Sequence, residues 1–344
     1  MKKTLIFILF SLSIISCNRN NSSKDILTHS VQLYHQKVFL KDELIFRNGE
    51  MLFFDKDSSL IIENFKSDSL LIKISLKDKK ISHFIPVGNG PNEFVDINLS
   101  QKISDSTLLF MDINSSQLFQ LNILTGYLQE DLSYNNSRCL RMAKVNNYYI
   151  STGIFEEGMF AIWDDTDFIS YQVDYPKDKV DNKNNASKGL AYQGKLLANA
   201  KLNRFLFCST LFTYFELFEF DTMTKNINSI KKNYIGEYEY VPSQDKNLVF
   251  AHPYENTREG YIDAFSTDDK IFLLYSGRSI EDAGIDNREK ARLSNQIHIY
   301  DWNGMLLFKY ETDIDLKNIC VNKSANKIYG IAYIPDPEIV FLEI

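Results

Sequence analysis

The sequence predicts an all-β fold: a six-bladed β-propeller whose ring is closed by an N-terminal strand that completes the C-terminal blade. Short apolar runs recur along the 344-residue chain, and turns rich in Asp, Asn, Ser and Gly separate them. The 19 Tyr and 25 Phe residues favour strands over helices. The runs also fall into units of four with a period of roughly 40–55 residues, which is typical of propeller blades.

The sharpest break lies at residues 87–94, Val-Gly-Asn-Gly-Pro-Asn-Glu-Phe, between two strand-like stretches. Its glycines allow positive φ, and Pro91 fixes its own φ and lacks an amide donor. We interpret this turn as the step from the first blade to the second. It lacks the Lys-Ser/Thr of a P-loop, and Pro91 removes an amide that a phosphate cradle would use, so phosphate binding is disfavoured.

Five units of four strands can be phased from this turn, and the expected strands are these: 51–54, 60–64, 70–76 and 82–87; 101–104, 108–112, 117–122 and 127–132; 140–145, 148–152, 159–163 and 168–173; 189–198, 204–209, 214–221 and 227–231; 261–265, 270–275, 296–301 and 305–310. The last unit has only three: 319–322, 327–333 and 338–344. An extended segment at 31–39 can supply the missing strand, and closure of the ring removes open sheet edges. A pair of β-sandwiches, the alternative, leaves both the unit count and this spare strand unexplained.

The N-terminus predicts export and a lipid anchor. Residues 1–16 have a short basic start and an apolar core of signal-peptide length, too short to span a bilayer. Ile-Ile-Ser before Cys17 resembles a bacterial lipobox, which implies cleavage before Cys17 and its acylation. Residues 17–27 are then a polar tether, and residues 28–344 the propeller domain. An ordinary signal peptide with an incidental cysteine is the alternative.

Several stretches together resemble the TolB-like six-bladed propeller lipoproteins of Bacteroidetes. They are the lipobox, Gly-Asn-Gly-Pro-Asn-Glu-Phe at 88–94, Ala-Tyr-Gln-Gly at 191–194, Ile-Phe-Leu-Leu-Tyr-Ser-Gly-Arg at 271–278 and Ile-Tyr-Asp-Trp-Asn-Gly at 299–304. The resemblance covers nearly all of the mature chain. It implies the propeller fold and an address in the cell envelope, and it implies no settled activity.

Charge and cysteine content narrow the remaining classes. The formal net charge is −7 and no basic stripe is present, so nucleic acid is not an expected partner. Beyond Cys17, three cysteines remain in apolar runs, Cys139, Cys208 and Cys320, and an odd number cannot all pair internally. We expect buried free thiols, with one disulfide as the alternative.

A binding surface is expected at one mouth of the channel, where blade-to-blade loops and the loops between second and third strands gather. Arg with Tyr and Asp suits a carboxylate or a sugar, although pairing between blades explains such residues equally well. The candidate ligand-binding residues are Asn89, Glu93, Arg141, Tyr192, Asp263 and Arg278. The charge-rich insertion at 279–295, with a helical turn at 289–293, is either a ligand or partner contact or a solvated flap.

No catalytic residue, metal site or cofactor is predicted. The five histidines (29, 35, 83, 252 and 298) show no ligand spacing. Residues 164–167, Asp-Asp-Thr-Asp, lack the glycine and distal Glu of a calcium loop, so a plain turn is expected. The chain has neither Gly-x-Ser-x-Gly nor a credible Cys–His pair.

Three functional hypotheses remain. The first is a non-enzymatic, lipid-anchored module, expected to be monomeric, that binds an envelope protein, peptide or glycan. The second is a metal-assisted hydrolase or lactonase, or a lyase, acting on a carbohydrate-derived substrate at the channel mouth. The third is a scaffold in outer-membrane nutrient uptake. Residues 18–21 lack the acidic run that many surface-exposed Bacteroidetes lipoproteins carry, so we expect an outer-membrane anchor facing the periplasm.

Overall fold

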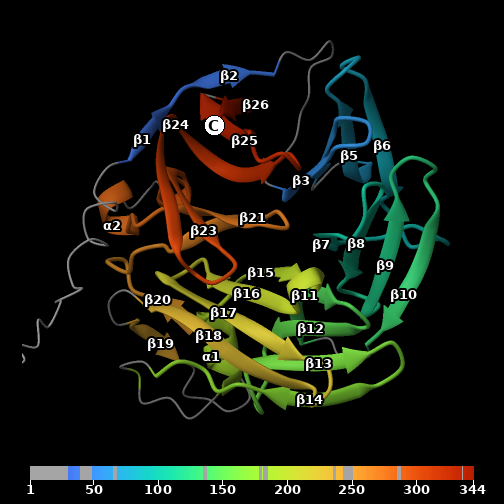
Figure 1. The fold of residues 1–344 in the computed structure, drawn as a ribbon, viewed down its shortest axis with the longest axis vertical. Helices are drawn as coiled ribbons and strands as arrows, with labels where there is room; N and C mark the ends of the chain where they lie inside the picture. Colours follow the sequence, from blue (N-terminus) through green and yellow to red (C-terminus); the bar gives the residue numbers. More distant parts are fainter. Residues whose placement is uncertain are drawn as a thin grey trace, which may run out of the picture.

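A computed structural model describes residues 30–38, 49–64, 68–134, 138–177, 180, 185–234, 238–242, 251–284, 288–334 and 336–344. These residues form antiparallel sheets that follow one another in a ring around a common centre (Figure 1). Each blade turns one strand toward the centre, and most adjacent innermost strands contact one another. The predicted six-bladed propeller is confirmed. The predicted signal peptide, Cys17 and the tether lie outside the described residues, and no described helix is long and apolar enough to cross a membrane.

Blades one to four are separate four-stranded sheets. Blade one has β3 (Met51–Phe54), β4 (Ser59–Glu63), β5 (Ser69–Ser75) and β6 (Ile81–Pro86). Blade two has β7 (Ile97–Lys102), β8 (Thr107–Asp112), β9 (Gln117–Asn122) and β10 (Leu128–Ser133). Blade three has β11 (Cys139–Val145), β12 (Tyr148–Gly153), β13 (Phe160–Asp164) and β14 (Phe168–Gln172). Blade four has β15 (Gly194–Asn199), β16 (Arg204–Ser209), β17 (Tyr214–Asp221) and β18 (Asn226–Tyr234).

Blades five and six share one long strand. Blade five has β21 (Tyr261–Ser266), β22 (Lys270–Tyr275), β23 (Ser294–Asp301) and the first half of β24 (Leu306–Val321). The register of β24 then shifts, and its second half becomes the innermost strand of blade six, followed by β25 (Lys327–Ile334) and β26 (Asp336–Glu343). One continuous strand therefore fixes the placement of the last two blades.

The N-terminal strand closes the ring, as predicted. β2 (His35–Lys37) pairs antiparallel with the outer edge of β26, with His35 opposite Leu342. Just before it, β1 (Val31–Leu33) runs parallel to the first half of β24. Figure 1 shows both strands along the rim outside β24 and β26. Leu33 and Val38 are buried in the core, so the closing segment is packed as well as hydrogen-bonded.

The strands expected at 305–310 and 319–322 are one continuous strand, β24, and two other strands begin at least four residues from their expected starts. The strand expected at 189–198 begins only at Gly194, and the residues before it form α1 (Asn185–Ala191). A Cβ on Gly189 would lie 2.3 Å from the carbonyl oxygen of Gly153, so the helix packs backbone to backbone on blade three. This tertiary contact explains a helix where the apolar pattern suggested a strand. In blade two, β7 begins at Ile97 and not at residue 101.

The insertions carry the remaining elements. The predicted helical turn at 289–293 corresponds to α3 (Arg288–Ala291). Before it, α2 (Ile280–Ala283) starts with a reciprocal capping box between Ser279 and Asp282. A two-stranded sheet of β19 (Tyr240–Pro242) and β20 (Ala251–Pro253) follows blade four.

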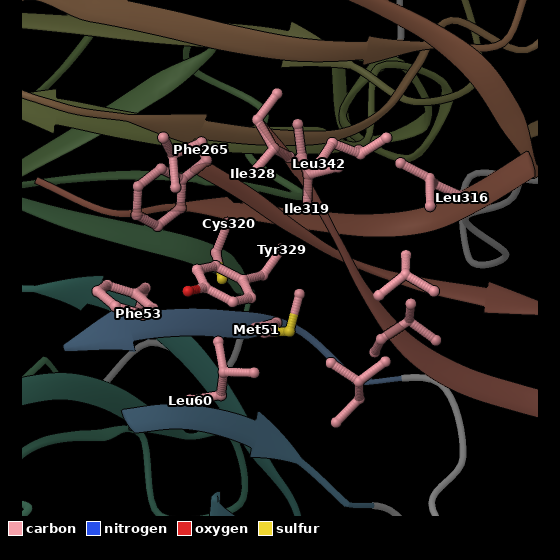
Figure 2. Close-up of a cluster of buried hydrophobic side chains, with 14 of the residues drawn as sticks. Met51, Phe53, Leu60, Phe265, Leu316, Ile319, Cys320, Ile328, Tyr329 and Leu342 are labelled. Carbon is pink, nitrogen blue, oxygen red and sulfur yellow. The ribbon is translucent and has the colours of Figure 1, made fainter. Parts of the chain in front are cut away.

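The core lies between neighbouring blades. Figure 2 shows the cluster where blade one meets blade six: Met51, Phe53 and Leu60 face Cys320 and Tyr329. The rings of Phe53 and Tyr329 stack with centroids 5.0 Å apart. The three described cysteines are buried and free, and burial raises the pKa of both Cys139 and Cys208 to about 12. These thiols stay protonated and behave as small apolar side chains.

Candidate functional site

The innermost strands enclose a cavity of about 750 Å³ that opens at one end of the channel. All innermost strands run toward this end and turn there into the second strand of their blade. Each blade contributes a residue near or at that turn to the cavity wall: Asp55, Asp105, Asn146, Lys201, Asp268 and Lys323. The binding mouth expected from the sequence lies at the other end, where the blade-to-blade loops are, so this larger cavity opens on the opposite face.

Four charged side chains from four blades meet at the inner end of this cavity, and we call them the central charge cluster: Glu50, Arg141, Lys195 and Asp263. Lys195 Nζ lies 2.8 Å from Glu50 Oε1 and 2.9 Å from Asp263 Oδ1. Arg141 Nη2 lies 3.0 Å from the same oxygen of Glu50. The approaches to Glu50 are at ion-pair distance but off the line of a good hydrogen bond, so the attraction is mainly Coulombic. The side chains of Lys195 and Asp263 are only 12% and 5% exposed, so water screens this pair weakly.

Burial and mutual attraction compete in the cluster. Burial opposes the charge on Glu50, but Lys195 and Arg141 outweigh it and hold the pKa of its carboxyl below the usual value. Burial likewise opposes the charge on Lys195, but Asp263 and Glu50 raise the pKa of its ammonium group. For Asp263 burial prevails and raises its pKa, although Lys195 and the amide of Ile319, which donates at 2.8 Å, favour the charged form. Lys195 therefore remains charged and is the main compensation for both carboxylates.

Glu63 of β4 supports the cluster from behind. Its carboxylate accepts the amide of Glu50 at 3.1 Å and that of Leu99, and so ties blade one to blade two. Burial and the charge of Glu50 raise its pKa to about 7, against the two donated amides. A Cβ on Gly49 would lie 1.9 Å from the carbonyl oxygen of Glu63, so only glycine lets the chain reach Glu50 by this path.

A second cavity, of about 140 Å³, lies between blades three and four. Tyr192 lines it, and Arg141 and Lys195 are the residues that line both cavities. The central charge cluster thus stands between the two.

The structure brings some of the candidate residues together and leaves others apart. Arg141 and Asp263 meet in the central charge cluster, and Tyr192 is buried against the rings of Tyr175, Tyr214 and Tyr238. The other three candidates, Asn89, Glu93 and Arg278, line neither cavity.

Those three have local contacts or exposure that account for them. Arg278 forms a two-pronged ion pair with Asp315, at 2.8 and 2.7 Å. Glu93 is exposed and accepts the amide of Gly90 at 2.9 Å, which stabilises the turn at 88–94. Asn89 is exposed in the same turn.

Sequence reasoning missed Glu50 and Lys195. The signal for Lys195 was a lone cation entering an apolar strand, Gly-Lys-Leu-Leu-Ala at 194–198. Glu50 stands directly before β3, the first innermost strand. Neither residue reveals its partner locally, because the partners belong to other blades.

No group of three or more His, Cys, Asp or Glu side chains is placed to hold a metal within the described parts of the chain. The turn at 164–167 is closed by Asp164, whose carboxylate accepts the amides of Thr166 and Asp167 at 3.0 and 2.9 Å. His298 stacks on Tyr275 with centroids 5.0 Å apart, and burial lowers its pKa to about 4.

The profile of the family described as "TolB-like 6-blade propeller-like" matches residues 32–324. The chain belongs to this TolB-like propeller family. The match spans the described elements from β1 through the innermost strand of blade six.

Solved structures share the fold of this TolB-like propeller at low sequence identity. A member of the DUF4221 family from Bacteroides vulgatus is similar, with a TM-score of 0.58 and 12% identity over 92% of this chain and 96% of that one. A Bacteroides fragilis protein provisionally described as exported has a TM-score of 0.52 and 13% identity, over 90% of this chain and 94% of its own. No curated protein matches the chain.

Chemically, the channel of this TolB-like propeller is suited to recognition. Ion pairs between blades hold its polar groups in place, and both positively and negatively charged side chains surround the opening of the larger cavity. Lys102 lies 3.1 Å from Asp55, and Lys323 lies 3.7 Å from Asp105. The arrangement offers hydrogen-bond donors and acceptors in fixed positions to a polar ligand.

Proposed function

We propose that this TolB-like propeller is a lipid-anchored binding module of the cell envelope that holds a partner at its channel without chemical turnover. The observation that carries the proposal is the cavity of about 750 Å³ to which all six blades contribute. Its volume lies within the roughly 300–1,000 Å³ usual for ligand sites.

Among protein, peptide and glycan partners, an extended peptide segment fits this lining best. Phe265 is the one aromatic side chain in the described wall, so there is little surface on which a sugar ring could stack. The wall instead alternates apolar side chains such as Leu52 and Leu197 with paired Lys and Asp residues. A peptide offers the same mixture of apolar side chains, charges and backbone hydrogen-bonding groups.

The test is a screen of the purified protein against a random peptide library and a glycan array. We expect binding of peptides, and loss of that binding in Ser104→Trp, because Ser104 is exposed at the rim and lines the cavity. Gln129→Trp is the matched control, since Gln129 is exposed on the outer strand β10 and lies outside the cavity wall. Ligands that bind both variants as well as the wild type would not use the channel, and the proposal would fail.

The lipid anchor and the location in the cell envelope are part of the same proposal. The signal-like residues 1–16 and the lipobox before Cys17 support acylation and export, and the provisional description of the B. fragilis protein agrees with an envelope location. Labelled palmitate should enter the wild type and be absent from Cys17→Ser. Protease treatment of intact cells should leave the protein whole if it faces the periplasm, whereas cleavage would place it on the cell surface.

The enzymatic alternative gains no support from the described residues. A metal-assisted lactonase or lyase would need a cation at the channel, but Lys195 already stands between the two carboxylates that converge there. Elemental analysis of the purified protein separates the two hypotheses, since a stoichiometric divalent metal would favour the enzyme.

A further inference from the structure

We propose that the smaller cavity, between blades three and four, is a binding site for a carboxylate group. This site is separate from the wide channel opening and does not depend on the identity of the partner held there. Strands β11 and β12 of blade three and β15 and β16 of blade four supply much of its wall.

The charge of the cavity carries the inference. Arg141 and Lys195 are the charged residues in its described lining, and both are cations. Their counter-ions Glu50 and Asp263 line the larger cavity and are absent from this wall. The two cations therefore face their carboxylates on one side and a cavity without an acid on the other. Two cations in the wall, with no acid beside them there, favour an anion over a cation in this confined site.

Arg141 also has hydrogen-bonding capacity left over. Its Nη1 donates to the carbonyl oxygen of Leu140 at 3.2 Å, and its Nη2 faces Glu50. Its Nε is buried and has no hydrogen-bond partner among the described residues. The Nε is out of reach of a ligand, but a guanidinium group has five N–H donors, so a second hydrogen on each Nη remains for one. The planar guanidinium group matches a planar carboxylate better than it matches a tetrahedral anion.

The remaining wall defines the rest of the ligand. Asn98, Thr152 and Thr210 add neutral polar groups, while Met159 and Phe207 add apolar surface. The volume of about 140 Å³ is close to the ~150 Å³ cavity that holds benzene, so the site takes about six heavy atoms. A carboxylate with a short apolar tail fits this composition.

Such a carboxylate has two sources. Gln193 is exposed and Thr210 half-buried, so the cavity reaches the protein surface near these two residues. A free short-chain acid could enter whole, or the carboxylate end of a longer molecule could reach in. Both use the same contacts with Arg141 and Lys195.

The experiment is isothermal titration of the folded protein, without the signal peptide, with acetate, propionate and butyrate. Parallel titrations use tri-alanine with a free carboxyl terminus, tri-alanine amide and inorganic phosphate. Binding of the short acids identifies a free acid as the ligand. Binding of tri-alanine but not of its amide identifies the end of a longer molecule.

Matched variants tie binding to the cavity. Thr152 lies opposite Arg141 in the β11–β12 register and lines the cavity, so Thr152→Leu should fill it and weaken binding by at least about tenfold. Thr152→Val keeps the volume and should retain most of the affinity. Arg141→Lys keeps the charge but loses the planar fork, and should weaken carboxylate binding more than Arg278→Lys, which alters an arginine outside the cavity. Circular dichroism confirms that each variant is folded.

Three results would overturn the proposal. One is no binding of any carboxylate up to about 50 mM, which is weaker than useful recognition. Another is equal affinity of the wild type and folded Thr152→Leu. The third is phosphate binding as tight as that of the best carboxylate, because a planar fork should separate the two anions.

Discussion

Lys195 holds two carboxylates apart at the centre of the ring. Without a cation between them, Glu50 and Asp263 would each raise the pKa of the other, because like charges in a poorly hydrated site disfavour ionisation. The ammonium group lies within 2.9 Å of both carboxylates, and the Lys195 side chain is only 12% exposed. The ion pairs also join blades one, four and five across the channel, so one side chain links elements distant in sequence.

Replacement of Lys195 should therefore destabilise the protein strongly. We expect Lys195→Met to lower the free energy of unfolding by about 3–5 kcal/mol, because it leaves buried carboxylates without a cation. Urea denaturation measures the change. Adding Asp263→Asn should recover part of the loss, since one uncompensated charge is removed.

Lys201→Met is the matched control. Lys201 pairs with Asp268 at the exposed rim, so its loss should leave the midpoint of unfolding nearly unchanged. If Lys195→Met behaved like Lys201→Met, the central charge cluster would not be a significant source of stability.

At the residue scale, the sequence identified only part of the central charge cluster. Arg141 and Asp263 were candidates because each lies on an expected innermost strand near the expected mouth, and the structure places both in the cluster. Their partners Glu50 and Lys195 were missed, because an ion pair between blades depends on how the blades are placed around the channel, and the local sequence does not show this. Arg278 is the opposite case: it was a candidate site residue but lies outside the cluster, because it pairs with Asp315 on β24, near the shift into blade six.

The closing strand is the element on which the ring depends. β2 covers the edge of β26, and an ion pair between Lys37 and Glu338 at 2.5 Å reinforces the pairing. A side-chain hydrogen bond between His35 and Asp313, at 2.9 Å, ties the same segment to β24. Leu33 and Val38 bury apolar surface from the same segment. The sequence predicted this closure because the last unit lacked one strand. It did not predict α1, because close packing of Gly189 on Gly153 is a tertiary contact without a local sequence signal.

Removal of this segment should open the ring. A chain that starts at residue 39 loses β1 and β2, exposes the edge of β26 and removes Leu33 and Val38 from the core. We expect a lower melting temperature and concentration-dependent oligomers, because an unpaired edge recruits strands from other chains. Calorimetry and size-exclusion chromatography measure both effects.

A chain that starts at residue 30 is the control, because it keeps every described strand. It should match the full mature chain in melting temperature and remain monomeric. Equal behaviour of the two truncations would show that β26 does not need its partner.

At the scale of the whole molecule, the sequence repeat predicted the ring but not the face on which the larger cavity opens. The period, the unit count and the spare N-terminal strand were sufficient for the six-bladed architecture. The position of the larger cavity was not predictable, because it depends on how far side chains from different blades, such as Lys102 of blade two and Lys201 of blade four, fill the channel. Side-chain volume across a channel is summed over distant strands and leaves no periodic pattern in the sequence.

Two buried groups give the whole molecule opposing responses to pH. Folded Glu63 has a pKa of about 7 against an ordinary value of 4.5, so its contribution to stability is present at low pH and is lost as pH rises from about 4.5 to 7. Folded His298 has a pKa of about 4 against an ordinary 6.5, so its contribution is present above about pH 6.5 and is lost as pH falls toward 4. The windows overlap and the signs are opposite, so the two contributions largely offset each other in the wild type.

Removing either group should reveal the pH dependence of stability that the other group causes. Relative to the wild type, Glu63→Gln should become more stable as pH rises from about 4.5 to 7, because the loss caused by Glu63 ionisation is gone. His298→Phe keeps a ring against Tyr275. Relative to the wild type, it should become less stable as pH rises from about 4 to 6.5, because it lacks the stability that His298 gains over that range. The difference in the free energy of unfolding between variant and wild type should change by at most about 1.4 kcal/mol per pH unit, the value for one proton. Urea denaturation at half-unit intervals measures the curves, with the exposed Glu343→Gln as a control that should run parallel to the wild type. Parallel curves for all three variants would mean that neither buried group changes its protonation on folding.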